Sequence, residues 1–199
     1  MTRRPYAKIL DTALKPFGFA RKGLDWTRVR GDLEETVNLQ PSWLGGRTVN
    51  LYVKDLETEK LFLEIFGSEG AIRMPPISAR VGQLIDNRDH WWGDEPNGPE
   101  RMAESTVRFG LPWFDKVRTP EEQAANWYGR YSKDTRSYYV PGMIGLALTL
   151  YRMGELAEAC LVLNAPVPRT ANAEGVRKIA RVREWLGCAH PDAKAGSAG

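Results

Sequence analysis

Two segments in which apolar and polar residues alternate stand on either side of residues 41–47, a stretch that contains Pro41 and two glycines. If the chain folds back about Leu44, apolar residues face apolar residues across the turn, and polar residues face polar ones. The facing pairs are Val37 and Leu51, Leu39 and Val49, Asn38 and Asn50, and Thr36 and Tyr52. We therefore expect an antiparallel hairpin with one buried face and one neutral polar face.

The same alternation predicts further strands. Residues 24–29 alternate, and Gly31-Asp32 supplies a turn into residues 35–39, which indicates a second hairpin. Residues 61–66 are apolar at nearly every position, as is typical of a strand covered on both sides. The sequence thus predicts an antiparallel sheet of about four strands.

Helical periodicity appears on both sides of the predicted strands. Residues 6–14 and 77–85 each place their apolar side chains on one stripe, which predicts helices that cover the sheet. The segment from Thr119 to Glu122 has the residue order of a capping box, so another helix is expected to begin there.

From Gly142 onward the pattern is helical throughout. The expected helices span residues 143–153, 156–163 and about 171–186. Three small residues stand where the helices of a tetratricopeptide-like hairpin would cross, namely Ala147, Gly154 and Ala159. Since only one such hairpin is visible, the fold class is predicted as α+β with an all-helical C-terminal extension. The expected parts are an α+β domain over residues 1–130, a helical extension packed on it over 131–190, and a flexible tail over 191–199.

Composition places the chain among folded proteins. Of its 199 residues 42% are hydrophobic and 27% are charged, close to the averages of globular domains. No apolar run approaches the length that spans a bilayer, and the N-terminus does not resemble a signal peptide, so we expect a cytoplasmic protein that does not associate with membranes. Cys160 and Cys188, the only cysteines, lie among apolar neighbours and are expected to be inert buried thiols.

The residues that usually carry catalysis or bind metals are sparse. Only His90 and His190 are available for histidine chemistry. The acidic residues near His90 are Asp86, Asp89, Asp94 and Glu95, and their spacing matches no calcium or zinc motif. Gly45-Gly46 is not followed by the residues of a phosphate-binding loop. We therefore predict no catalytic residues, no metal site and no cofactor.

Two features favour binding. The polar hairpin face offers amides and a phenol that can hydrogen-bond a peptide or a polar ligand, although a face of this kind can also be simply solvated. In the polar loop 86–99, the adjacent residues Trp91 and Trp92 cannot both point inward, so one is expected to pack down while the other lines a groove or a partner surface. The candidate binding residues are Asn38, Gln40, Asn50, Tyr52, Arg80, Trp91 and Trp92.

Short motifs in a fixed order resemble a known bacterial family. They comprise residues 14–19, 21–23 and 37–42, Arg80 to Leu84 leading to Trp91-Trp92, and Gly110 to Phe114. In this order the sequence is similar to the DUF4304 family over about residues 5–130. The family is a domain of unknown function, so the resemblance implies a fold and brings no activity.

The leading interpretation is a non-enzymatic module that binds a protein or a peptide through the polar face and the tryptophan loop, with the helical hairpin as a second contact surface. One alternative is an enzyme or ligand-binding protein for a small phosphorylated or nucleotide compound. A second alternative is nucleic-acid binding by the basic N-terminal region, with Tyr6 and Trp26 as stacking groups. We do not expect nucleic acid as the partner, because the excess positive charge is modest.

Overall fold

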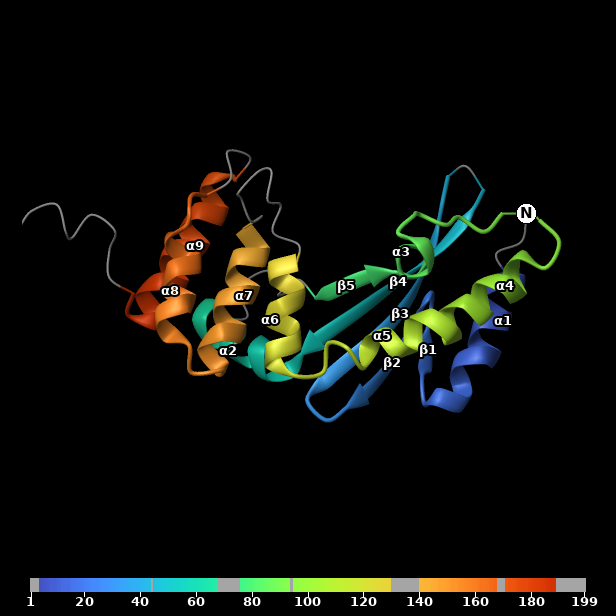
Figure 1. The fold of residues 1–199 in the computed structure, drawn as a ribbon, viewed down its shortest axis with the longest axis horizontal. Helices are drawn as coiled ribbons and strands as arrows, with labels where there is room; N and C mark the ends of the chain where they lie inside the picture. Colours follow the sequence, from blue (N-terminus) through green and yellow to red (C-terminus); the bar gives the residue numbers. More distant parts are fainter. Residues whose placement is uncertain are drawn as a thin grey trace, which may run out of the picture. The chain divides into compact units, whose positions relative to one another are not determined.

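Five antiparallel strands form a simple meander in the order β1-β2-β3-β4-β5 (Figure 1). The strands are β1 Ala20–Lys22, β2 Asp25–Arg30, β3 Leu33–Pro41, β4 Arg47–Asp55 and β5 Ile77–Arg80. The computed structural model describes residues 4–43, 45–67, 76–93, 95–129, 140–167 and 171–188. The sheet with its helices and the helical C-terminal part confirm the α+β class.

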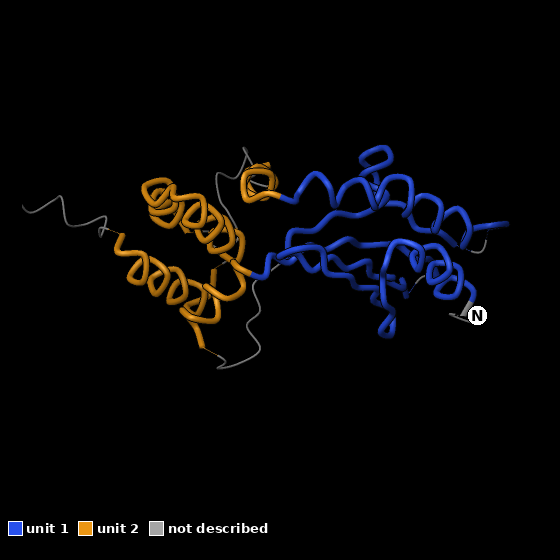
Figure 2. Tube along the Cα trace, turned by 90° about the horizontal axis from the view of Figure 1, so that it is seen from below, with its two compact units in different colours: residues 1–56, 76–118 blue, residues 57–75, 119–199 orange. Residues whose placement is uncertain are grey.

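The chain divides into two compact units (Figure 2). Unit 1 comprises residues 1–56 and 76–118 and contains the whole sheet, whereas unit 2 comprises residues 57–75 and 119–199 and is helical in its described parts. The sequence-based boundary near residue 130, the packing of the extension on the sheet domain and the flexible tail stay predictions. The tail lies outside the described residues.

The hairpin of β3 and β4 has the predicted register. Val37 lies opposite Leu51 and Asn38 opposite Asn50, and the neighbouring pairs keep the same register. Along β3 buried and half-buried residues alternate from Leu33 to Gln40, so one face of the sheet is core and the other is polar. Pairing of β2 with β3 confirms the second predicted hairpin.

Two predicted elements are wrong, both between residues 56 and 86. Residues 61–66 belong to helix α2 (Leu56–Phe66), whose buried residues Phe62, Ile65 and Phe66 have helical spacing. The expected helix over 77–85 is instead strand β5 followed by the short helix α3 (Val81–Asp86). Strand β5 pairs with the free edge of β4, a contact between distant parts of the chain that local periodicity does not show.

Helices of unit 1 cover the apolar face of the sheet. They are α1 (Arg4–Leu14), α4 (Gly98–Ser105), the π-helical turn Thr106–Gly110 and α5 (Leu111–Phe114), with a 3₁₀ turn at Lys15–Phe17. The buried Trp26 of β2 donates from Nε1 to Asp11 of α1 at 2.8 Å. Gly110 packs so closely on Leu51 that a Cβ there would come within 3.3 Å of it. The helix predicted over residues 6–14 is confirmed.

A buried carboxylate lies within this apolar layer. Glu35 is fully buried and accepts hydrogen bonds from Arg28 and Arg30, each with a shortest contact of 2.6 Å. Arg30 also reaches Asp115 at 2.9 Å. Burial alone would lower the pKa of the Arg30 guanidinium, but its hydrogen bonds to Glu35 and Asp115 raise that pKa above its ordinary value.

Unit 2 consists of α2 with four later helices, and these match the predicted helical pattern. They are α6 (Pro120–Gly129), α7 (Val140–Arg152), α8 (Leu156–Asn164) and α9 (Ala173–Leu186). The capping box of α6 is confirmed, since Thr119 and Glu122 each donate a backbone N–H to the other's side chain. Helices α7 and α8 pack as a hairpin in which Ala147 and Ala159 are fully buried. No described helix is both long enough and apolar enough to cross a membrane.

The prediction of two inert thiols is wrong, because Cys160 of α8 and Cys188, just beyond α9, form a disulfide. Their Cα atoms are 5.4 Å apart, within the usual range for such a bond. Sequence spacing alone could not reveal this pair, since it depends on how three helices fold back on one another.

Candidate binding face

Six of the seven predicted binding residues come together on the polar face of the sheet. Asn38 and Gln40 project from β3, Asn50 and Tyr52 from β4, and Arg80 stands at the end of β5 opposite Asn50. Strand alternation places them all on the side away from the helices. With their neighbours they form what we call the amide face: Asp25, Asn38, Gln40, Thr48, Asn50, Tyr52, Arg80, Asp89 and Trp91.

A chain of hydrogen bonds connects the amides across four strands. Arg80 Nε donates to Asn50 Oδ1 at 3.2 Å. Asn50 Nδ2 in turn donates to Asn38 Oδ1 at 3.2 Å and to Gln40 Oε1 at 2.8 Å. Asn38 Nδ2 completes the chain by donating to Asp25 Oδ1 at 2.6 Å.

The two ends of the chain fix the direction of every hydrogen bond within it. A guanidinium can only donate, so Asn50 turns its oxygen to Arg80 and its NH₂ group to the next two amides. An ionised carboxylate can only accept, so Asn38 turns its NH₂ group to Asp25. Gln40 is the open branch, because its oxygen is used by Asn50 and its NH₂ group has no partner among the described residues, which leaves it for a ligand or for water.

Charges on the amide face and beside it are balanced, because Lys22 of β1 stands opposite Asp25 and two further cations contact carboxylates. Arg80 Nη1 contacts Asp89 at 2.6 Å, and on the same side of the sheet Lys54 contacts Glu34 at 3.1 Å. Partial burial raises the pKa of the Tyr52 hydroxyl above its ordinary value. The positive charge of Arg80 lowers this pKa in part, and the negative charge of Asp25 raises it further. Tyr52 is therefore a neutral hydroxyl group at physiological pH.

The two loop tryptophans point in opposite directions, as the sequence predicted that they must. Trp92 forms an antiparallel bridge with Arg47, on the apolar side of β4, and its side chain is only 4% exposed. Trp91 lies on the other side, beside Gly46, and is 40% exposed. The guanidinium of Arg80 lies 5.8 Å from the centre of the Trp91 ring, a cation–π contact. Trp92 thus belongs to the core, and Trp91 forms one wall of the amide face.

A glycine in α3 lets this loop approach the sheet domain closely. A Cβ at Gly82 would lie 2.5 Å from the backbone nitrogen of His90 and 2.7 Å from the carbonyl oxygen of Arg88. Any other residue would push residues 88–90 away and displace Asp89 and Trp91 with them. The Tyr6 hydroxyl of α1 holds the far end of the loop by donating to the Gly93 carbonyl.

Sequence reasoning missed three members of the amide face and one exposed tryptophan. Thr48 faces Gln40 across the hairpin, and strand alternation could have identified it. Asp25 and Asp89 belong to the face because of the order of the strands and the path of the loop, and the sequence alone shows neither. Trp43, in the turn between β3 and β4, is 92% exposed, and its place in a glycine-rich hairpin turn was the available signal.

A family model described as "Domain of unknown function (DUF4304)" matches residues 10–116, about half of the chain. The chain belongs to the DUF4304 family. Every residue of the amide face lies within the matched range of this DUF4304 protein. Comparisons with curated proteins and with solved structures found no match.

The acidic loop of this DUF4304 protein is held by internal ion pairs. His90 Nε2 lies 2.9 Å from Asp86 Oδ1, and this hydrogen bond lowers the pKa of the Asp86 carboxyl below its ordinary value. Asp89 turns away to Arg80, and Asp94 lies outside the described residues. Within the described ranges, no three His, Cys, Asp or Glu residues are grouped closely enough to hold a metal ion.

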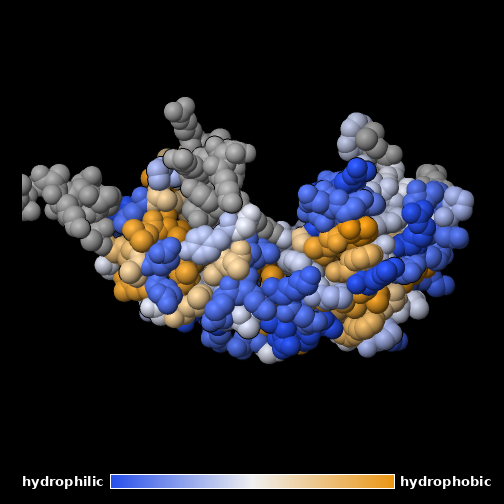
Figure 3. Space-filling view, viewed as in Figure 1, coloured by the Kyte–Doolittle hydropathy of each residue, from blue (hydrophilic) through white to orange (hydrophobic). Residues whose placement is uncertain are grey.

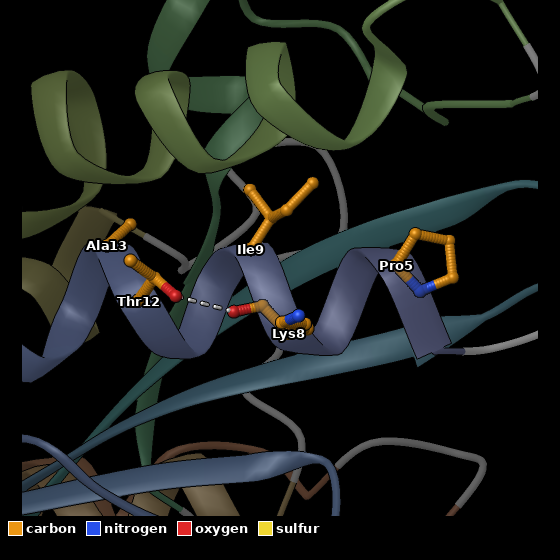
Figure 4. Close-up of a pocket in the computed structure, with 5 residues that line it drawn as sticks. All are labelled: Pro5, Lys8, Ile9, Thr12 and Ala13. Carbon is orange, nitrogen blue, oxygen red and sulfur yellow. Dashed lines mark hydrogen bonds between the residues drawn. The ribbon is translucent and has the colours of Figure 1, made fainter.

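A groove of about 510 Å³ runs along α1 (Figure 4). Its lining residues are Pro5, Lys8, Ile9, Thr12 and Ala13. The hydrogen bond drawn in the figure is internal to the helix, from the Thr12 hydroxyl to the Lys8 carbonyl at 3.1 Å. Lys8 is the one titratable group in the lining, so the groove offers no pair of groups for acid–base chemistry.

The aromatic groups expected to stack on nucleic acid are not accessible. Tyr6 and Trp26 are both buried, and each uses its polar atom to hold a neighbouring element of unit 1. This removes the aromatic half of the predicted N-terminal nucleic-acid site.

Proposed function

We propose that the amide face binds a peptide or a segment of another protein, and that the chain is a binding module and not an enzyme. The observation that carries the proposal is the chain of hydrogen bonds from Arg80 through Asn50 to Asp25, which holds a row of amides in place beside the exposed Trp91. Side chains held in this way lose little conformational freedom when a ligand binds. A partly exposed tryptophan at the edge of a polar surface is a typical anchor for a protein partner.

The charged groups of the face also favour binding over catalysis. Asp89 is paired with Arg80, and Asp25 accepts a hydrogen bond from Asn38. Both carboxylates are thus engaged by donors within the face, where they hold other side chains in place.

Unit 2 offers a second contact surface, as the sequence-based interpretation proposed. Figure 3 shows hydrophobic residues gathered over α8 and α9. Leu161 of α8 is 64% exposed, and Leu156 and Val176 are also exposed. Aliphatic groups on the outside of a helical hairpin suit a protein partner better than a small polar ligand.

The alternative of a phosphorylated or nucleotide ligand has one observation in its favour. A base could stack on Trp91, whose ring Arg80 already approaches. The balanced charge of the face works against a phosphate group, because Asp25 and Asp89 lie among the groups that would receive it.

Capture of partners from the native cell lysate tests the proposal, with Trp91→Ala as the informative variant. We expect one nuclease-resistant partner to be retained by the wild type and lost from the variant, and Trp91 of the wild type to be protected from oxidative footprinting in the complex. Val29→Ala is the matched control, because Val29 is exposed on the same face at its other end. Equal capture by Trp91→Ala and the wild type, with no protection of Trp91, would remove the amide face from the proposal.

A cytoplasmic location remains part of the proposal, and the disulfide is the observation that weighs against it. Disulfides persist mainly in oxidising compartments, whereas the cytosol keeps most thiols reduced. Alkylating the protein in intact cells before lysis, then measuring the mass of the fragments with Cys160 and Cys188, distinguishes the two cases. Largely alkylated cysteines would support the cytoplasm, and a fully oxidised pair would point to an oxidising compartment.

A further inference from the structure

We propose that the amide face takes an extended, proline-containing segment. Carbonyl oxygens of that segment bind the donors of Gln40, Thr48 and Trp91, and a proline ring packs on the Trp91 indole. This inference rests on the proposed function and specifies the class of peptide that the face accepts. It is carried by the polar groups that the hydrogen-bond chain leaves unused.

The first observation is the direction of the hydrogen-bond chain. Because Arg80 can only donate, the oxygens of Asn50, Asn38 and Gln40 are all used as acceptors within the face. The NH₂ group of Gln40 has no hydrogen bond to any described residue, and neither has the indole N–H of Trp91. The groups left for a ligand at this end of the face are therefore donors, and they call for a ligand rich in acceptors.

The second observation is a buried hydroxyl without a partner at the same end. Thr48 is only 1% exposed, and no described residue makes a hydrogen bond to its Oγ1. Thr48 faces Gln40 in the hairpin, and the bridge between Arg47 and Trp92 sets a register in which Trp91 faces Thr48. A buried hydroxyl left unpaired costs stability, so its presence between two unused donors indicates a group that a ligand completes when it docks there and the Trp91 ring facing Thr48 shifts to admit it.

The balance of charge selects a neutral ligand. Lys54 contacts Glu34, Arg80 contacts Asp89, and Lys22 stands opposite Asp25 on the same side of the sheet, so each of these cations has a carboxylate beside it and none is in surplus to draw in a phosphate or a carboxylate. The common neutral acceptor that a macromolecule offers in a row is the peptide carbonyl group.

Proline satisfies these conditions better than other residues. It has a carbonyl acceptor and no N–H, and the extended polyproline conformation leaves its carbonyl oxygens without internal partners. Proline-rich segments characteristically dock on surfaces lined by aromatic side chains, because their flat rings pack on the aromatic ring and their backbone is already extended. Trp91, held in contact with Arg80, supplies such a ring beside the donors.

Titration of the full-length protein with a blocked decaproline peptide tests the inference, followed by NMR of the tryptophan indole N–H signals. The Trp91 signal is assigned with Trp91→Phe. We expect that signal to shift on titration, while a blocked peptide of alternating glycine and alanine has no effect at concentrations up to about 1 mM, where even a weak complex would be populated.

Two substitutions separate a role in binding from a role in folding. Thr48→Val keeps the shape of the side chain and removes the hydroxyl, and Gln40→Glu keeps the acceptor for Asn50 while it removes the NH₂ donor. Each is expected to weaken decaproline binding by about three- to tenfold, the usual effect of one lost hydrogen bond. Thr48→Val should unfold no earlier than the wild type, and Val29→Ala should bind decaproline as the wild type does.

Each result decides between the inference and the function on which it rests. Binding of decaproline that weakens in both variants supports the inference. The inference is overturned if decaproline does not bind, or if both variants bind it as tightly as the wild type does. It is also overturned if a nucleoside monophosphate, and not decaproline, shifts the Trp91 indole signal. If decaproline fails while Trp91→Ala still loses its partner, the proposed function stands with a different peptide class. If Trp91→Ala retains the partner and Trp91 is not protected in the complex, both proposals are wrong.

Discussion

Reducing the bond between Cys160 and Cys188 should destabilise unit 2 without changing its native structure. Helix α9 is held in place by its own packing as well as by the disulfide, since Ile179, Val182 and Leu186 are all buried. The native contacts of α9 should therefore survive reduction, and the effect of the disulfide should arise mainly in the unfolded chain.

The size of the effect follows from the length of chain that the bond closes. The two cysteines are 28 residues apart. For a loop of that length, loop-closure entropy removes about 12 cal/mol/K from the unfolded ensemble, or about 3.6 kcal/mol at 25 °C. Measured contributions of disulfides scatter around such values and are typically about 2–4 kcal/mol, so we expect reduction to lower the free energy of unfolding of unit 2 by about that amount.

Hydrogen exchange measured by mass spectrometry is the suitable assay, because it reports on each unit separately. The slowest amides of α7, whose residues are nearly all buried, should exchange roughly 30- to 1000-fold faster after reduction, as the expected range of free energy implies. Amides of β3 and β4 in unit 1 are the internal control and should keep their rates. The double variant Cys160→Ser with Cys188→Ser should behave like the reduced wild type.

Two results would refute this reasoning. Unchanged exchange in α7 and α9 after complete reduction would mean that the disulfide does not stabilise unit 2 by lowering the conformational entropy of the unfolded chain. An equal acceleration in β3 and β4 would mean that the disulfide stabilises the whole chain, and that the two units do not unfold separately.

Three further predictions concern unit 1. Glu35→Gln should lower the free energy of unfolding by about 2–3 kcal/mol in urea denaturation, because it leaves the partly buried Arg28 without its carboxylate and Arg30 with only the exposed Asp115; a change below about 0.5 kcal/mol would contradict this role. Trp92→Ala should cost about 3–5 kcal/mol in the same assay, whereas Trp91→Ala should cost less than about 1 kcal/mol, and equal losses would show that the assigned directions are wrong. The lowered pKa of Asp86 means that its bond to His90 adds stability at pH values above the ordinary carboxyl value of 3.8, and that this contribution is lost as the pH falls through the lowered value. In an NMR titration, His90→Ala should therefore return the pKa of the Asp86 carboxyl toward 3.8, and an unchanged titration would rule out the imidazole as the cause.

The parts of the fold that could be predicted are those decided by neighbours in the sequence. The register of β3 with β4 follows from the alternation of residues 36–52, since a slip of one residue would turn every apolar side chain toward solvent. The capping box of α6 lies within four residues. Residues 61–66 were predicted wrongly because a short apolar run fits a buried strand and a buried helix equally well.

The candidate site was predicted in part for a related reason. Asn38, Gln40, Asn50 and Tyr52 share one face because strands alternate, which a sequence reveals. The predicted helix over 77–85 was wrong at its start, so the pairing of Arg80 with Asn50 was not anticipated. The membership of Asp25 and Asp89 depends on sheet order and on the path of a loop, and neither is encoded in local spacing.

Arg80 connects the two parts of the proposed binding face. Through Nε it sets the direction of the amides of the sheet, through Nη1 it holds Asp89 of the loop, and its guanidinium lies near the Trp91 ring. A lysine there would keep the positive charge but could not hold two acceptors in fixed directions beside an aromatic ring. Because the unused donor of Gln40 and the position of Trp91 both depend on this one side chain, the donors and the aromatic wall are expected to act as one site.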